Sequence, residues 1–285
     1  MGFIDTPLPS VTAYVDLMSA HDVPVLRRTV KELATLRERQ ESLGGKPVAA
    51  VVLADPLMTM KLLTTLQANR TAKQNHDITT IDRAIMMMGI TPFFDRFANL
   101  TTVEDTLAAH PKALVGVLKV IARARRAAHF ARDWAILRHD LDVDEITVAA
   151  LLQEAVEILC WTIAPTLTQQ VYDMQRGDPS LRSTLAQRAV FGVTAHEIQF
   201  ELVRAWQLPE LLVTLMDEAH ADHPRVRNVL LAANFARHLS EGWDNPGLPD
   251  DIAEIEKLVH LNRETLLARL GTPQEELFRF SVPAT

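Results

Sequence analysis

The chain has 285 residues, of which 48% are hydrophobic and 23% are charged, so a disordered or fibrous protein is excluded. Glycine is scarce, with 10 residues, and aromatic residues make up only 6% of the chain, which favours helices over sheet. The net charge of −7 argues against a protein that binds the phosphate backbone of nucleic acids.

The first 21 residues contain Pro7 and Pro9 and lack a helical period, so we expect a lead-in segment there. Apolar spacing predicts a helix over residues 25–43 that ends at Gly44-Gly45. Residues 47–53 are apolar and fit either a strand or a helical turn. Asp55 followed by Pro56 predicts the start of a helix that runs to about residue 68.

Thr79 and Asp82 have the spacing of a capping box, which predicts a short helix that ends at Gly89, and Pro92 is expected to open the next element. The longest periodic segment covers residues 111–138. Asp142 and Glu145 are expected to cap a single, almost wholly apolar core helix over residues 146–163.

Helix-start signals continue to the C-terminus, and no segment with the period of a strand appears, so the sequence predicts an all-α protein. These signals are Thr194 with Glu197, Pro209, Pro224 and Thr272-Pro273 with Glu275. No stretch of about 18 uninterrupted apolar residues and no leader-like N-terminus occurs, so we expect neither secretion nor a membrane span. A single cysteine, Cys160, is typical of a reducing compartment and indicates a cytoplasmic protein.

Most candidate chemical motifs have a simpler structural interpretation. No phosphate-binding glycine-rich loop is present, and Cys160 lies in an apolar run without a nearby base, so we interpret it as a core residue. Asp140, Asp142 and Asp144 alternate as in a calcium loop but lack the glycine and the final acid that such a loop needs, so they are expected to cap the next helix. His139-Asp140 lies in the same polar connection and is not interpreted as a site.

The best metal-like cluster combines two histidines with three acids near a helix end: His220, His223, Asp217, Glu218 and Asp222. A solvated helix terminus is the simpler interpretation of this cluster.

The arginines at 123, 125, 126, 132 and 138 predict either a salt-bridged face or a surface for an anionic partner, and Met86-Met87-Met88 is interpreted as core filler.

Several short motifs follow one another along the chain: Val23-Pro24-Val25-Leu26, Asp55-Pro56-Leu57-Met58-Thr59, Ile78-Thr79-Thr80-Ile81, Met88-Gly89-Ile90, Leu151-Leu152, Trp206-Gln207-Leu208-Pro209 and Ala219-His220. In this order and spacing they resemble the HDOD domain, a bacterial relative of the HD-type metal-dependent phosphohydrolases, across residues 22–239. The resemblance implies a multi-helical fold in which an N-terminal helical lobe, residues 22–110, packs on an HD-like helical lobe, residues 111–245. Residues 1–21 would precede these lobes, and residues 246–285 would form a C-terminal helical extension.

An active HD site needs histidine and aspartate side chains that converge on divalent ions. Aligned without gaps to the HD pattern, this chain departs from it at almost every ligand position. Those positions hold Arg123, Gln153, Glu154, Ala195, Ala219 beside the retained His220, and Asn234. Alanine cannot bind a metal and arginine adds positive charge, so we expect no metal, no cofactor and no catalytic residue, and an ion pair between Arg123 and Glu154 instead.

The resemblance implies a non-enzymatic bacterial signal-transduction or regulatory module that acts through contacts with an unidentified protein partner. One alternative is a residual metal-dependent phosphohydrolase built on His220, His223 and neighbouring carboxylates. Another is a protein that binds an anionic nucleotide near residues 123–132 without hydrolysing it. The sequence does not indicate the oligomeric state.

Overall fold

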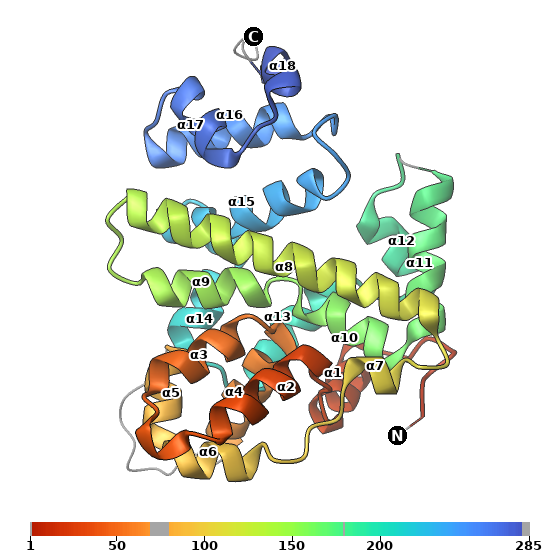
Figure 1. Cartoon of the computed structure of the whole chain (residues 1–285). Coiled ribbons are helices and arrows are strands. Elements are labelled where there is room, and N and C mark those ends of the chain that lie inside the picture. Colours follow the sequence, from red (N-terminus) through yellow and green to blue (C-terminus); the bar gives the residue numbers. More distant parts are fainter. Residues whose placement is uncertain (1, 69–79, 179, 281–285) are drawn as a thin grey trace. The chain divides into compact units, whose positions relative to one another are not determined.

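The computed structural model describes residues 2–68, 80–178 and 180–280 of the chain, and these residues form helices joined by turns and irregular connections (Figure 1). Within these ranges no strand occurs, and one isolated bridge joins Val25 to Thr102. The predicted all-α fold is confirmed. Ile78 and Thr79, which belong to a motif and to the capping box expected from the sequence, lie outside the described residues.

The chain divides into two compact units, and each unit is built from two separate stretches of sequence. Unit 1 comprises Met1–Ala122 and Glu154–Val213, and unit 2 comprises Arg123–Gln153 and Thr214–Thr285. The chain therefore passes between the units at three places. The lobe boundaries inferred from the family resemblance remain predictions.

Unit 1 holds the N-terminal helices and a second group from the middle of the chain. Its helices are α1 (Val11–Ala20), α2 (Arg27–Arg37), η1 (Gln40–Ser42), α3 (Gly45–Leu53), α4 (Pro56–Ala68), α5 (Ile81–Met88), α6 (Ile90–Arg96), α7 (Val103–Thr106), the first part of α8 (Pro111–Leu137), α10 (Ala155–Ile163), α11 (Pro165–Gly177), α12 (Ser183–Phe191), α13 (Ala195–Ala205) and most of α14 (Glu210–Leu215).

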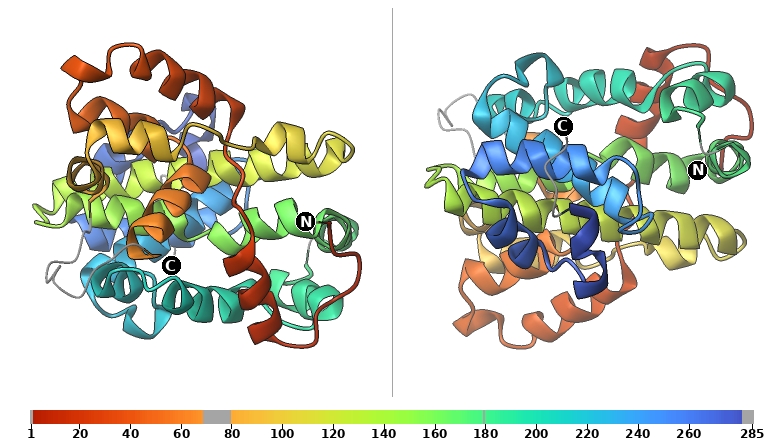
Figure 2. Two further views of the ribbon diagram at one scale, coloured as in Figure 1. Left: turned by 90° about the horizontal axis from the view of Figure 1, so that it is seen from below. Right: turned by 90° about the horizontal axis from the view of Figure 1, so that it is seen from above.

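The N-terminal segment contains a helix, contrary to the expected irregular lead-in. Ser10 caps α1 by accepting a hydrogen bond from the amide of Ala13, and the helix packs on α13 (Figure 2). The fully buried Tyr14 accepts a hydrogen bond from the amide of Leu8 and donates one to the carbonyl of Phe191. Contacts with distant residues therefore stabilise a segment whose own pattern is weak.

Asp55 organises the start of α4 as its pairing with Pro56 predicts. Its buried carboxylate accepts hydrogen bonds from the amides of Leu57 and Met58, in the first turn of the helix. It also accepts bonds from the amide of Leu26 at 2.8 Å and the hydroxyl of Thr29 at 2.7 Å. One buried acid thus joins α2 to α4 and supplies acceptors to donors that would otherwise be unpaired.

The glycine pair after α2 begins a helix, whereas the sequence suggested only the end of one. Helix α2 stops at Arg37, and α3 starts at Gly45, so the ambiguous residues 47–53 are helical. Gly45 is buried, and a Cβ there would lie 2.8 Å from Cγ of Met86 in α5. The glycine therefore allows close contact between α3 and α5. Similarly, α6 begins at Ile90, ahead of Pro92.

Unit 2 contains the second half of α8, the helix that follows it and the C-terminal helices. After α8 these are α9 (Val143–Leu152), η2 (Glu218–His220), α15 (Pro224–Leu239), α16 (Leu248–Val259), α17 (Arg263–Leu270), η3 (Gln274–Glu276) and α18 (Leu277–Phe280). Helix α15 packs against α9 and α16 (Figure 2). Arg269 of α17 makes two 2.6 Å contacts with the Asp133 carboxylate of α8, so the C-terminal extension packs on the helices before it.

The apolar stretch predicted as one core helix is two helices, α9 and α10, and the break falls at Gln153 and Glu154. Neither proline nor glycine marks this break in the sequence. The stretch Val143–Ile163 is long and apolar enough to cross a membrane, but 83% of its most apolar window is buried in the protein. This burial is consistent with core helices of a soluble protein.

Candidate functional site

The HD-type ligand positions of unit 2 lie in different environments. Arg123 is half-buried on α8, and Gln153 forms the C-terminal cap of α9. Ala219 and His220 lie in the exposed turn η2, and Asn234 is on the exposed side of α15. The side chain of His220 is 58% exposed, and its Nδ1 lies 3.3 Å from Oδ2 of Asp217.

Two further positions belong to unit 1. Glu154 is buried at the N-terminal cap of α10, and Ala195 is the first residue of α13. The amide of Ala195 donates a hydrogen bond to Oε1 of Gln187 at 2.9 Å. Because Arg123 and Glu154 belong to different units, the ion pair between them remains a prediction.

The histidine and aspartate cluster around η2 makes local contacts that fix a turn. The amide of Ala219 donates to Oδ1 of Asp217 at 2.9 Å, and the amide of Arg225 donates to Nδ1 of His223 at 3.3 Å. Across residues 2–68, 80–178 and 180–280, no three His, Cys, Asp or Glu side chains converge in a way that could hold a metal ion. The donor set of this unit does not fit the two-metal centre of an HD phosphohydrolase.

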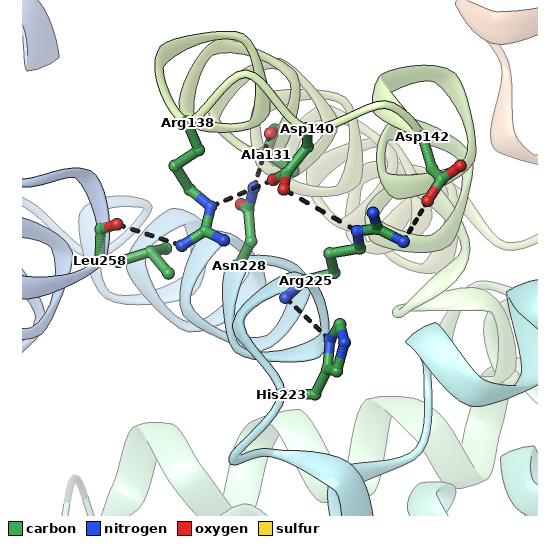
Figure 3. Close-up of polar contacts among 8 residues, drawn as sticks. All are labelled: Ala131, Arg138, Asp140, Asp142, His223, Arg225, Asn228 and Leu258. Atoms are coloured by element: carbon green, nitrogen blue, oxygen red, sulfur yellow. Dashed lines mark hydrogen bonds and ion pairs between the residues drawn. The ribbon is translucent and has the colours of Figure 1, made fainter.

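A different set of polar side chains does converge in unit 2, where the connection between α8 and α9 meets the first turn of α15 (Figure 3). We call this set the arginine–aspartate cluster, and its members are Arg138, Asp140, Asp142 and Arg225. Nε of Arg138 lies 3.1 Å from Oδ2 of Asp140, and Nε of Arg225 lies 3.8 Å from Oδ1 of the same carboxylate. Arg225 also contacts Asp142 through Nη1.

The backbone at the end of α8 places Asp140 in this cluster. The amide of His139 bonds to the carbonyl of Ile136, and the amide of Asp140 bonds to the carbonyl of Ala135. His139 adopts a φ of 56°, the left-handed conformation that normally favours glycine. This pattern is a Schellman motif, which ends a helix by satisfying its last carbonyls. The motif turns the chain sharply, and His139 itself lies outside the cluster.

The cluster connects three parts of unit 2. The guanidinium of Arg138 donates to the carbonyl of Leu258 at the end of α16, at 3.2 Å. On α15, the fully buried Asn228 donates from Nδ2 to the carbonyl of Ala131 on α8, at 3.1 Å, while its Oδ1 has no hydrogen-bond partner in the described structure. Helices α8, α15 and α16 are thereby linked through polar groups at one corner.

The cluster contains two guanidinium groups and two carboxylates, so its formal charges cancel. The side chains of Asp140 and Arg138 are only 9% and 17% exposed, so removing one partner of this pair would leave a poorly solvated charge and would cost more than breaking a surface pair. Asp144, the third acid of the calcium-like pattern, pairs with Arg132 at 2.8 Å. The predicted helix-capping role is therefore wrong for the carboxylates of Asp140, Asp142 and Asp144. Asp142 does occupy the N-terminal cap position of α9, but its carboxylate contacts Arg225 and does not cap the helix.

The other candidate residues divide between core and surface. Cys160 is buried in α10, and desolvation, with a smaller effect of the Glu157 charge, raises the pKa of its thiol to about 12. The interpretation of Cys160 as a core residue is confirmed. Met86 and Met87 are 59% and 47% exposed, so their interpretation as core filler is wrong. On α8, Arg125 and Arg126 are exposed.

Sequence reasoning missed Arg225 and Asn228. One signal was available for each. An arginine directly after Pro224 lies at the positive end of the helix dipole, which is unfavourable unless acids compensate it. Asn228 is a polar residue on the buried side of α15, which is otherwise apolar on that side. Their partners come from a distant stretch of the chain and could not be identified without the structure.

The HDOD domain family profile matches residues 23–222. The chain belongs to the HDOD family. Two solved structures are similar in fold. The MmoQ response regulator of Methylococcus capsulatus has 19% identity and a TM-score of 0.63, and the match covers 89% of this chain and 99% of that chain. A virulence factor of Campylobacter jejuni has 18% identity and a TM-score of 0.62, and the match covers 94% of this chain and 95% of that chain. A search of curated proteins gave no match. The HDOD match ends before α15, so Arg225, Asn228 and Asn234 lie beyond it.

Proposed function

We propose that this HDOD protein is a non-enzymatic signalling module of the bacterial cytoplasm that regulates its target through protein contacts. Family membership and the fold shared with a response regulator support a regulatory role. The single cysteine supports the cytoplasmic location.

The donor chemistry of unit 2 carries the non-enzymatic part of the proposal. In the ungapped alignment, Gln153 stands where an HD enzyme has an imidazole ligand, and Asn234 stands where it has the final carboxylate. Asp217, which contacts the retained His220, accepts a hydrogen bond from the amide of Ala219, and Asp140 and Asp142 pair with Arg225. A carboxylate bound to a guanidinium is a poor ligand for a divalent ion, because the cation would have to displace a bound positive charge.

A hydrolysis assay tests the proposal directly. The purified full-length protein is incubated with Mn²⁺, Mg²⁺ or Fe²⁺ and with bis(p-nitrophenyl) phosphate or a cyclic dinucleotide, beside an active HD enzyme. We expect no turnover above that of the His220→Ala variant. Metal-dependent hydrolysis that is lost in His220→Ala overturns the proposal in favour of a residual phosphohydrolase.

The nucleotide-binding alternative has one favourable observation, the exposed Arg125 and Arg126 on α8. Calorimetric titration with a panel of cyclic nucleotides separates it from a protein-contact role. We expect flat titrations across the panel. Saturable heat that disappears in an Arg125→Ala/Arg126→Ala variant would instead assign nucleotide binding to this helix.

A further inference from the structure

Within unit 1, the N-terminal part of α8 and the helix α11 contribute cations to one aromatic ring. Nζ of Lys119 lies 5.8 Å from the ring centre of Tyr172, and the guanidinium of Arg176 lies 6.0 Å from it. Tyr172 and Arg176 are four residues apart and so lie on the same side of α11. Figure 1 shows this end of α8 beside α11.

The backbone beneath this surface is closely packed. Gly116 of α8 lies against the Trp161 ring of α10, where a Cβ would approach ring atoms to within 2.6 Å. Trp161 in turn packs edge-on against Tyr172, with the ring centres 6.4 Å apart. One buried tryptophan therefore packs against both helices.

Apolar side chains accompany the cations on α8. Val115 and Leu118 are 54% and 39% exposed and are three residues apart, so they are neighbours on the helix surface. Lys112 and Lys119 are exposed and lie one turn before and one turn after Val115. The exposed aliphatic groups are thus flanked by positive charges along the helix.

These cations are available to a partner. None of Lys112, Lys119 and Arg176 forms an ion pair with a residue in the described part of unit 1. The nearest acid along α11, Asp173, accepts a hydrogen bond from Gln169 at 2.9 Å. A locally positive surface on a chain of net charge −7 is complementary to an acidic ligand.

We infer that this surface binds an acidic amphipathic helix of a partner protein. The surface consists of Lys112, Val115, Leu118, Lys119, Tyr172 and Arg176. An apolar stripe on the partner helix would cover Val115 and Leu118, and flanking glutamates would pair with the lysines and Arg176. This inference rests on the proposed protein-contact function and specifies the chemistry of the partner.

Fluorescence anisotropy with labelled peptides tests the inference. The probe is a helix-forming peptide of about 18 residues, or about five turns, with a leucine stripe flanked by glutamates. Its matched control carries lysines in place of the glutamates. We expect the glutamate peptide alone to bind, and to lose roughly tenfold in affinity towards Lys119→Glu/Arg176→Glu, because two attractive charge pairs become repulsive. Raised salt should weaken the binding.

The control variant Lys31→Glu/Arg39→Glu changes the net charge equally at exposed positions on and after α2, and should bind the probe like the unaltered protein. Circular dichroism checks that both variants fold. Equal binding of the two peptides, or an unchanged affinity in Lys119→Glu/Arg176→Glu, overturns the inference. So does charge-dependent binding to mixed phosphatidylcholine and phosphatidylglycerol vesicles without binding of the glutamate peptide, because that result assigns the surface to a membrane.

A second readout separates failure of this inference from failure of the proposed function. Pull-down from native cytoplasm with the full-length protein identifies partners, and hydrogen exchange maps their contact surface. A partner supports the inference if it protects the amides of α8 and α11 in unit 1 from hydrogen exchange and no longer binds the variant Lys119→Glu/Arg176→Glu. A partner retained by the variant overturns this surface but leaves the protein-contact function intact.

Discussion

Arg138 and Asp140 form a 3.1 Å ion pair across the single residue His139, whose backbone is left-handed. Two sets of contacts therefore stabilise the end of α8: the backbone hydrogen bonds of a Schellman motif, and side chains that also contact α15 and α16. This corner stabilises the packing of unit 2, and two predictions follow from it.

Replacing Arg225 by alanine should lower the free energy of unfolding by about 1–3 kcal/mol, because the largely buried Asp140 and its neighbour Asp142 lose a cationic partner. Urea denaturation measures the change. The matched control is Arg132→Ala, which removes a pair whose two side chains are 49% and 56% exposed, and should change stability by at most about 0.5 kcal/mol. Equal effects of the two variants would contradict a structural role for the cluster.

Replacing His139 by glycine should stabilise the protein by about 0.5–1 kcal/mol, because glycine adopts a φ of 56° without the steric strain of a Cβ. Thermal unfolding followed by circular dichroism detects the shift. The same substitution at the exposed His129, inside α8, should destabilise by about 0.3–0.5 kcal/mol, the difference between the helix propensities of histidine and glycine. Destabilisation by both substitutions would show that the left-handed residue is not strained.

Replacing Gly116 by alanine should destabilise unit 1 by about 1–3 kcal/mol, because the added methyl group overlaps the Trp161 ring. A second substitution, Trp161→Leu, should make Gly116→Ala better tolerated than it is beside the tryptophan. Gly177→Ala, at a position with no atom within 4 Å of the new Cβ, serves as the control and should be neutral or stabilising. Additive effects at residues 116 and 161 would argue against the close contact.

The contribution of Glu197 to stability should depend on pH. Hydrogen bonds from the amide and hydroxyl of Thr194, helped by Arg188, hold the pKa of Glu197 below its usual value of 4.5. A depressed folded-state pKa stabilises the native protein above the unfolded-state pKa, and this contribution disappears as the pH falls through the folded-state pKa.

Stability curves of the natural protein and Glu197→Gln should therefore differ at pH 7 and converge below about pH 4.5. Glutamine keeps the capping geometry, so the comparison isolates the charge. Glu201→Gln removes a charge from the same helix and controls for net charge. A difference that stays constant at acidic pH would contradict the assignment.

Local signals in the sequence predicted those elements whose start depends on adjacent residues. Asp55 with Pro56 and Thr194 with Glu197 mark helix starts correctly, because a cap bonds to amides two or three residues away. Helix α1 was missed because its stability depends on Tyr14 contacting Phe191, far along the chain. The break at Gln153 and Glu154 was also missed, and no local rule marks it.

The candidate site was less predictable than the fold for the same reason. The salt-bridged arginines that the sequence suggested as one interpretation occur at Arg132 on α8 and at Arg138 directly after it. The sequence assigned the nearby aspartates to helix capping, because the competing partner, Arg225, lies more than eighty residues away and approaches only when α15 packs beside α9.

The three crossings of the chain between the units also constrain how the gene can vary. Neither unit is encoded by one uninterrupted stretch, since residues 123–153 of unit 2 are inserted within unit 1. Recombination at a single junction could not transfer one unit to another protein intact. We therefore expect the two units to be inherited together, and a stop codon after residue 213 to leave α8 and α9 without the helices that cover them.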